Sequence, residues 1–227
     1  MTELSRYVFE ALRKDEEFIL YRARSEEEPS RVLVLSPVAQ YPTPESLGRL
    51  EHEYSLKEEL DHAWAILPLA ITRHWDRTVL VLEDPGGLPL HQLLGGPLDL
   101  ASSLRLAIGL STAIGHLHRR GIIHEDVKPA NVLVSSVSGQ CRLTGFSIAS
   151  RLQRERRSLE PPEFIAGTLA YMAPEQTGWM NRSIDSRSDL YALGVTLYEI
   201  VTVSLTFTVF DPMEWVSLPY CAPGSST

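Results

Sequence analysis

Cysteine is scarce in this 227-residue chain, and an excess of positive charge is missing. Cys141 and Cys221 lie far apart and give neither a disulfide framework nor a metal-knuckle spacing, so a reducing, cytoplasmic location is expected. The formal net charge of −8 excludes a generic binder of nucleic acids or anionic membranes, because such partners require a basic surface. With 44% hydrophobic and 22% charged residues, the composition is that of a globular protein.

A signal peptide and a clear membrane span are also missing. The first residues lack the basic start and the apolar run of a signal peptide, so export is not expected. Residues 190–210 imitate a span, because Glu199 is their only formal charge and about 20 residues suffice to cross a bilayer. Scattered Thr and Ser and the lack of a basic flank argue against insertion. We expect instead a helix buried on all sides in a large core.

The first third of the sequence predicts strands and one helix. Short runs rich in β-branched, aliphatic and aromatic residues are separated by charged gaps, as in a meander of hairpins. These runs are residues 7–12, 17–24, 31–39 and 77–84. Thr43 precedes Pro44, a pair typical of a helix N-terminus, and apolar residues then follow at helical spacing.

The pattern becomes helical after a break at residues 85–87, where a proline precedes two glycines. A long helix is predicted from Asp99 to a glycine stop at Gly121. Its core-facing side is expected to hold Leu100, Leu104, Ile108 and Leu117. We therefore predict an α+β protein with a small strand-rich lobe over residues 1–84 and a helical lobe over residues 85–227.

Spaced motifs in the second lobe resemble those of the eukaryotic-type protein kinase family. Its catalytic loop reads His-Arg-Asp, then four residues, then Asn. The matching residues here are His124, Glu125, Asp126 and Asn131, followed by Ala-Pro-Glu at 173–175 and by Asp189. Their order and spacing imply a two-lobed, protein-kinase-like fold.

The resemblance covers roughly residues 18–215, and Lys128 and Thr168 match the serine/threonine class. More narrowly, residues 167–199 are similar to the N-terminal kinase-like domain of large bacterial multidomain sensor proteins, the hybrid histidine kinases. The family's last helices have no counterpart after residue 215. The resemblance therefore implies a truncated, C-terminally incomplete helical lobe.

The catalytic residues that the resemblance implies are present. Asp126 would orient the proton of a substrate hydroxyl, and Lys128 would lie beside the transferred phosphoryl group. Asn131 would help to hold a magnesium ion, and Thr168 belongs to the same catalytic set. The alternative is that this loop persists only as packing.

The parts that would hold magnesium and the phosphates are degraded. The family's metal-chelating Asp-Phe-Gly is replaced by Gly145, Phe146 and Ser147, which leaves Asn131 as a weak metal ligand. Ser36 stands where the third strand should provide a phosphate-binding lysine. Because phosphoryl transfer depends mostly on positioning and charge neutralisation, these losses matter more than the loss of a base would.

The parts that would hold the nucleotide are degraded as well. Residues 12–18 (LRKDEEF) contain no glycine, and their three carboxylates would repel a triphosphate. Leu82 matches the gatekeeper residue of the family, so the carbonyl of Glu83 can accept a hydrogen bond from the adenine amino group. The N–H donor expected two residues later would have to come from Pro85, and proline has no backbone N–H. ATP and magnesium are the cofactors that the resemblance implies, and these losses predict that they bind weakly or not at all.

Other polar residues are given structural interpretations. Without its lysine, Glu53 is expected to be solvated on a helix face. Glu125 replaces the arginine that would read a phosphorylated loop, so activation by loop phosphorylation is not expected. His116, His118 and His124 are not expected to form a metal site, because positions two apart on a helix point to different faces.

The sequence favours a pseudokinase-type regulatory module that binds a protein partner or the downstream domains of a sensor protein. The alternative is an active serine/threonine protein kinase that transfers phosphate from ATP to a protein hydroxyl, supported by Asp126, Lys128, Asn131 and Thr168. A non-functional fragment and a membrane-associated protein are weaker alternatives. Nucleic acid and membrane insertion are not expected.

Overall fold

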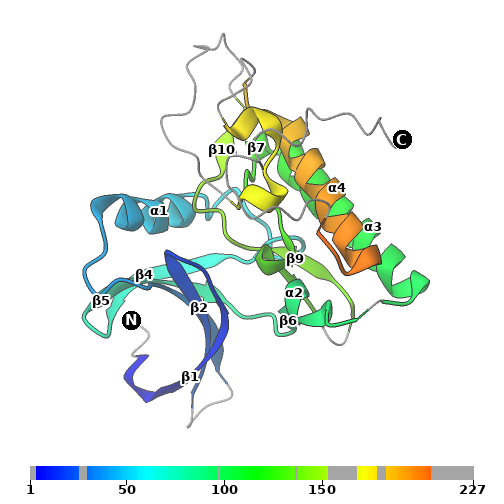
Figure 1. Cartoon of the computed structure of the whole chain (residues 1–227). Helices are drawn as coiled ribbons and strands as arrows, with labels where there is room; N and C mark the ends of the chain where they lie inside the picture. The colour runs from blue at the N-terminus through cyan, green and yellow to red at the C-terminus, as the bar shows by residue number, and fades with distance from the viewer. Residues whose placement is uncertain are drawn as a thin grey trace, which may run out of the picture.

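The computed structural model describes residues 4–25, 30–96, 98–135, 138–152, 168–177 and 183–205. Within them the chain is α+β, with a strand-rich first part and a second part dominated by two long helices (Figure 1). The linker, residues 84–87, connects the last strand of the first part to the second part. The candidate site lies where the two parts meet.

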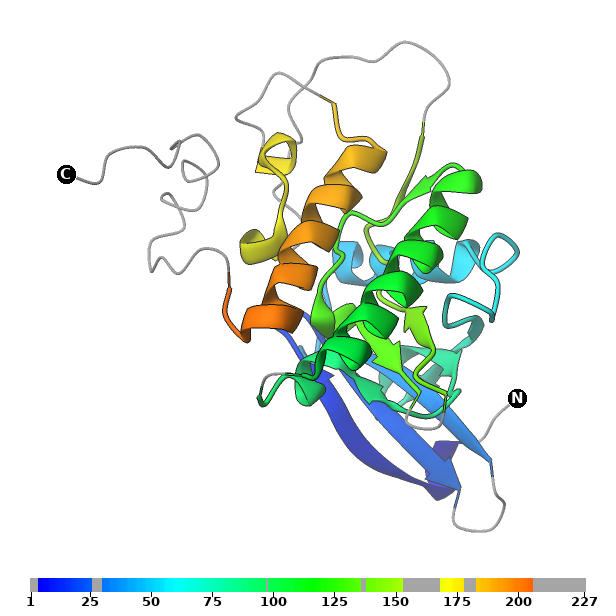
Figure 2. The ribbon, with the colours of Figure 1, turned by 90° about the vertical axis from the view of Figure 1, so that its right-hand side faces the viewer.

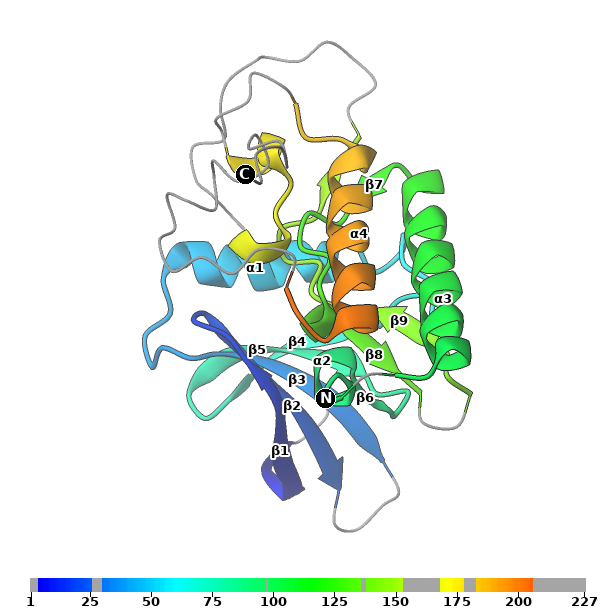
Figure 3. The same ribbon diagram turned by 45° about the vertical axis from the view of Figure 1, so that its right-hand side comes forward.

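The first part is a five-stranded antiparallel sheet in the order β1-β2-β3-β5-β4. Its strands are β1 (Tyr7–Lys14), β2 (Phe18–Ser25), β3 (Arg31–Pro37), β4 (Pro68–His74) and β5 (Arg77–Glu83), preceded by the short 3-10 helix η1 (Leu4–Arg6). Helix α1 (Pro44–Ser55) lies between this sheet and the second part (Figure 3). Its predicted start is confirmed, because the Thr43 hydroxyl accepts the Ser46 N–H and Pro44 occupies the first turn.

The two faces of the sheet belong to different hydrophobic clusters. The inner cluster combines the face turned toward α1 with one residue of the second part, Leu133. Its members are Leu12, Phe18, Leu20, Leu33, Leu35, Leu50, Ile66, Leu80, Leu82 and Leu133. The opposite face packs Val32, Val34, Val79 and Val81 under Leu4. This separation fixes which strand residues face the site.

The second part consists of short strands against two long helices. Its elements are β6 (Leu88–Pro89), α2 (Leu90–Leu93), α3 (Leu100–Arg119), β7 (Ile122–Ile123), η2 (Pro129–Asn131), β8 (Val132–Val134), β9 (Cys141–Leu143), β10 (Ser150–Arg151), η3 (Leu169–Tyr171), η4 (Pro174–Thr177) and α4 (Ser186–Thr202). Strands β6, β8 and β9 form one small sheet, and β7 pairs with β10. Helices α3 and α4 lie side by side (Figure 2).

Helix α3 exists as predicted, with the Asp99 carboxylate accepting the Ser102 N–H at its start, but its predicted core side was wrong. Leu100, Leu104 and Ile108 are exposed, and of the predicted set only Leu117 is buried. The buried side instead contains Leu106, Leu110, Ala113, Ile114 and Leu117. Apolar residues occur on both sides of this helix, so spacing alone did not identify the core side.

Helix α4 corrects the expectation for the apolar stretch 190–210. The helix ends at Thr202, followed by Val203 in the left-handed conformation, and residues 206–210 lie outside the described residues. Leu190, Tyr198 and Val201 are exposed, so the helix is not buried on all sides. By length and composition, α3 is the one helix of the described residues that could cross a bilayer, a test that core helices of soluble proteins also pass.

Candidate active site

One buried aspartate holds the loop after β7 in place. Asp189 of α4 is fully enclosed, and its carboxylate accepts the backbone N–H groups of His124 and Glu125, both at 2.9 Å. His118 Nε2 lies 2.8 Å from the same carboxylate. Glu125 has a positive φ of 66°, so these two hydrogen bonds fix a bend that few non-glycine residues adopt.

His124 is a packing residue of the loop. Its ring is fully buried, lies 4.7 Å from the ring of Phe146, and its Nε2 is 3.2 Å from the Thr144 carbonyl oxygen. The Asp126 N–H donates to His124 Nδ1 at 3.3 Å. Burial lowers the pKa of His124, so the neutral ring orients the loop through its acceptor nitrogen. Of the other histidines considered, His118 bonds Asp189 and His116 stacks on a tryptophan.

The loop brings the predicted catalytic residues together. Lys128 Nζ lies 2.7 Å from Asp126 Oδ2 and donates to the Thr168 hydroxyl at 2.5 Å. The Thr168 N–H donates to the other carboxylate oxygen of Asp126 at 3.1 Å. Asn131 Nδ2 donates to Asp126 Oδ2 at 2.7 Å and to the Asp126 carbonyl at 2.8 Å. A carboxylate, an ammonium group, an amide and a hydroxyl are therefore arranged as one network.

Gly145 closes this network on one side. It has a φ of +82°, and a Cβ at this position would lie 2.8 Å from Asn131 Oδ1. Glycine has no side chain that could chelate a metal, and an added side chain would crowd Asn131 at this backbone conformation.

Arg13 reaches into the site from the end of β1, a contact that the sequence did not suggest. Its guanidinium donates to Asn131 Oδ1, and the side chain is only 9% exposed. Asp15 accompanies it at 3.7 Å. The segment without glycine thus places a cation on Asn131 Oδ1, an atom that the sequence indicated as a weak metal ligand. In the sequence, Arg13 is only one basic residue after Leu12, and nothing there indicates its contact with Asn131.

Glu53 was expected to be solvated, and this prediction was wrong. Its side chain is 1% exposed, and neither carboxylate oxygen has a hydrogen-bonding partner of normal geometry among the described residues. Burial raises the pKa of Glu53 to about 7, and the positive charge of Arg13 and nearby backbone N–H groups offset this only in part. The helix therefore places a buried, only partly compensated carboxyl group beside Arg13.

The lysine position on β3 is also reassigned. Residues alternate between the faces of a strand, so Ser36 shares the face of Val34, which packs with the outer cluster. Leu33 and Leu35 belong instead to the inner cluster, which also contains Leu50 of α1. The position facing α1 is therefore occupied by Leu35, and Ser36 lies one residue away on the opposite face. Neither residue provides the positive charge of the lysine that the resemblance implies on this strand.

Side chains of the sheet and of the second part meet in one hydrophobic cluster. Leu82 and Leu133, on opposite sides of it, are 0% and 1% exposed and belong to the same inner cluster as Leu12. Gln92 of α2 donates to the Leu12 carbonyl at 2.6 Å, which joins β1 directly to the second part. Glu83 follows Leu82, and its carboxylate accepts the Leu67 N–H.

A buried ion pair ties β2 to the linker. Arg22 Nε lies 2.8 Å from Asp84 Oδ2, and the Arg22 guanidinium also donates to the Gly87 carbonyl at 2.7 Å. The two side chains are 5% and 0% exposed. This pair could not be predicted from the sequence, because a lone Arg in a strand and a lone Asp in a turn give no pairing signal. The contact holds the linker against the sheet.

Glu125, Glu175 and Arg151 are three other charged residues of the second part. Burial raises the pKa of Glu125 to about 7. Glu175 accepts the Ser188 hydroxyl at 2.7 Å, and Arg151 pairs with Glu59 at 2.5 Å.

The residues that the structure describes do not fit a magnesium–nucleotide complex. Asn131 Oδ1, the remaining implied ligand, accepts from Arg13, and one Asp126 oxygen is paired with Lys128. Gly145 supplies nothing in the place of the chelating Asp. Coordination of magnesium requires several oxygen ligands around one position, and this arrangement offers them to neighbouring cations and amides instead.

Comparison with known proteins identifies relatives. The protein kinase domain family matches residues 37–215. A probable serine/threonine-protein kinase of Streptomyces coelicolor is 35% identical over 136 residues, which cover 59% of this chain and 20% of that protein. PknB of Mycobacterium tuberculosis is 32% identical over 137 residues (60% and 21%), and pkn2 of Myxococcus xanthus is 32% identical over 173 residues (74% and 21%). The chain thus spans about a fifth of the length of these curated relatives.

Proposed function

The chain belongs to the family of protein kinase domains, and on that premise we propose that it is a pseudokinase, a regulatory kinase domain that does not use ATP and magnesium. Members of this family generally bind both. The proposal rests on the contact of Arg13 with Asn131. The Arg13 guanidinium donates a hydrogen bond to Asn131 Oδ1, the side-chain oxygen that a magnesium ion would need as a ligand.

The charge arrangement supports weak or absent phosphoryl transfer. The expected strand lysine is replaced by an apolar or hydroxyl residue, and the chelating Asp by Gly145. If each lost electrostatic contact costs on the order of 10² to 10³ in rate, two losses reduce a typical kinase turnover of about 1–100 s⁻¹ below roughly 10⁻² s⁻¹. Such losses need not multiply, because groups that act as a unit are non-additive.

The packing between the two lobes supports the same proposal. Leu82 and Leu133 are packed in one cluster, and Gln92 bonds β1 to α2. Binding of a nucleotide would have to break these contacts before any new contact formed. A domain with this geometry is suited to present its surface to other proteins in one closed conformation.

The wider setting is part of the proposal. We propose that the module acts in the cytoplasm on a protein partner or on downstream domains of a larger sensor protein. The similarity of residues 167–199 to kinase-like domains of sensor proteins motivates this setting.

A thermal-unfolding experiment tests the proposal. The purified chain is heated with ATP alone, with ATP and magnesium, and with ATP and EDTA. A ligand at 100 times its dissociation constant adds about 2.7 kcal/mol, and each kcal/mol moves a domain of this size by roughly 2–4 °C. We expect a cooperative transition without a shift. A magnesium-dependent shift would refute the proposal, and a chain without any transition would be a fragment.

The second candidate is an active serine/threonine protein kinase. The observation in its favour is the network of Asp126, Lys128 and Thr168, in which a carboxylate and an ammonium group are arranged as a phosphoryl transfer requires. Radiolabelled ATP and a general protein substrate test it. Transfer that is lost in Asp126→Ala and kept in Asp61→Ala, which changes an aspartate outside the site, would establish this candidate.

A further inference from the structure

The side chain of Arg142, which lies near the linker, has no hydrogen-bonding partner among the described residues. It lies on β9, opposite Leu133 of β8 in the strand register. Its Nε is shielded from solvent, and its side chain makes no hydrogen bond or ion pair with the described residues. Arg13 and Arg77 also have an unbonded buried Nε, but their terminal nitrogens bond Asn131 and the Pro37 carbonyl, respectively. A buried, unsatisfied donor of this kind calls for an explanation.

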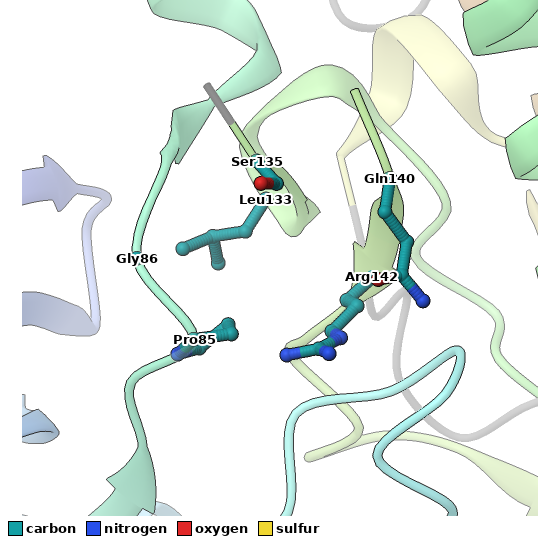
Figure 4. Close-up of a pocket in the computed structure, with 6 residues that line it drawn as sticks. All are labelled: Pro85, Gly86, Leu133, Ser135, Gln140 and Arg142. Atoms are coloured by element: carbon teal, nitrogen blue, oxygen red, sulfur yellow. The ribbon is translucent and has the colours of Figure 1, made fainter. Parts of the chain in front are cut away.

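A cavity of about 40 Å³ adjoins this guanidinium. It is lined by Pro85, Gly86, Leu133, Ser135, Gln140 and Arg142. Figure 4 shows the Arg142 side chain extending from β9 toward Pro85 of the linker, with Leu133 and Ser135 above the gap between the two. A single water requires about 10–15 Å³ by the same kind of measure, so the cavity accommodates a group of a few heavy atoms.

The lining combines positive charge, one hydroxyl donor and apolar walls. The Ser135 hydroxyl accepts the Ser138 N–H at 3.2 Å, which leaves its own proton available for a ligand. Gln140 is occupied elsewhere, because its amide donates to the Ala63 carbonyl at 2.7 Å. Pro85 and Leu133 provide the apolar surface. The site thus offers the fork of a guanidinium and one hydroxyl beside a hydrocarbon wall.

We propose that this cavity binds a carboxylate group on a short apolar stem. A guanidinium fork matches the two oxygens of a carboxylate, and charge-assisted hydrogen bonds of this kind are stronger than neutral ones. The volume is sufficient for the carboxylate and one or two carbons. Such a group is carried by small carboxylic acids and by the Asp and Glu side chains of a protein. The site lies outside the catalytic network and does not depend on the proposed function.

The test uses acetate as the probe and two-dimensional NMR of the ¹⁵N-labelled chain as the readout. Acetate should produce saturable shifts of the amide signals of Gly86, Ser135 and Gln140, whereas sodium chloride at equal ionic strength should not. Arg142→Gln should weaken acetate binding at least about tenfold, equivalent to about 1.4 kcal/mol. Arg142→Lys should give an intermediate loss, because it keeps the charge without the fork.

Arg73→Gln is the matched control, since Arg73 is an exposed arginine of β4 and should leave acetate binding unchanged. Absent or non-saturable shifts in the unaltered chain would overturn the proposal, and this outcome needs no variant to fold. Equal binding by Arg142→Gln and the unaltered chain would overturn it as well. Tighter binding of inorganic phosphate than of acetate would show an anion site of another class and would also refute it.

Two further probes distinguish the sources of the carboxylate. N-acetyl-glutamate amide presents a Glu side chain on a peptide backbone, and benzoate presents a carboxylate on a stem too wide for the cavity. Binding of the glutamate derivative at least as tight as that of acetate supports a protein partner's side chain as the occupant. Binding of acetate alone supports a free small acid. Benzoate that binds as tightly as acetate would contradict the size limit and the assigned cavity.

Discussion

Arg13 and Asn131, 118 positions apart in the sequence, are joined by a hydrogen bond from guanidinium to side-chain amide oxygen. This contact connects the first hairpin of the sheet to the catalytic loop. It also places a positive charge beside Glu53, whose carboxyl group is buried without a hydrogen-bonding partner of normal geometry among the described residues. The bond therefore joins the two lobes through the chain's own cation.

Removal of this cation should destabilise the closed arrangement. Arg13→Ala leaves the Asn131 oxygen unpaired and removes the positive charge beside Glu53, so the free energy of unfolding should fall by about 1–3 kcal/mol. Urea unfolding measures this change, and Lys14→Ala, which alters the exposed neighbour, is the control. Equal stability of the two variants would mean that the bond does not hold the lobes together.

The free energy of unfolding should depend on pH through the titration of Glu53. Its pKa is about 7 in the folded chain against 4.5 as the reference value, so the folded state binds more protons between these values. Stability therefore falls as the pH rises from about 4.5 through 7 and levels off above, by up to about 3 kcal/mol for a shift of this size. Glu125, with its pKa also raised to about 7, acts in the same direction.

Glu53→Gln isolates this contribution, because an amide keeps the shape and does not ionise. Urea unfolding at several pH values should show the variant close to the unaltered chain at pH 5 and more stable at pH 8 by about 1–3 kcal/mol. Glu51→Gln, at an exposed position of the same helix, should leave the pH profile unchanged. A Glu53→Gln variant that is less stable at pH 8 would contradict the assignment.

The catalytic loop could be predicted from sequence because its function depends on short, fixed spacing. Asp126, Lys128 and Asn131 lie within six positions, and the structure brings them together with Thr168. The contact of Arg13 could not be predicted in this way. It depends on how two lobes close on each other, and no local pattern encodes that distance.

The errors have a common physical cause, which is that burial is decided by packing between elements. Glu53 was assigned to solvent because a carboxylate without a partner is costly to bury, and the fold buries it nevertheless. Ser36 was matched to a motif, whereas strand alternation and the place of Leu35 in the inner cluster decide which residue faces α1. On α3, apolar residues on both sides made the choice of the core side ambiguous.

Restoration of an acidic residue at the metal position should fail for a geometric reason. Gly145→Asp places a Cβ 2.8 Å from Asn131 Oδ1 at a φ of +82°, so strain and crowding act together. Gly139→Asp is the matched control, because Gly139 has a φ of +69° but nothing within 4 Å of its added Cβ. We expect Gly145→Asp to lower the unfolding free energy by about 1–3 kcal/mol more than the control does. Equal losses would show that Asn131 yields without cost.

The ion pair between Arg22 and Asp84 should be among the most sensitive contacts of the fold. Both side chains are almost fully enclosed, so Asp84→Ala leaves a buried guanidinium without its counter-charge and should cost about 3–5 kcal/mol. The exposed pair of Arg24 and Glu10, with N···O at 3.5 Å, provides the control, and Glu10→Ala should cost less than about 1 kcal/mol.

The double variant Arg22→Met with Asp84→Ala separates the penalty of an unpaired charge from the value of the pair. It should recover part of the loss seen in Asp84→Ala, because no buried charge is left without a partner. Urea unfolding of the three variants measures the coupling. If Asp84→Ala cost no more than Glu10→Ala, the linker would be hydrated and free to move, and the closed geometry assigned to the lobes would have to be abandoned.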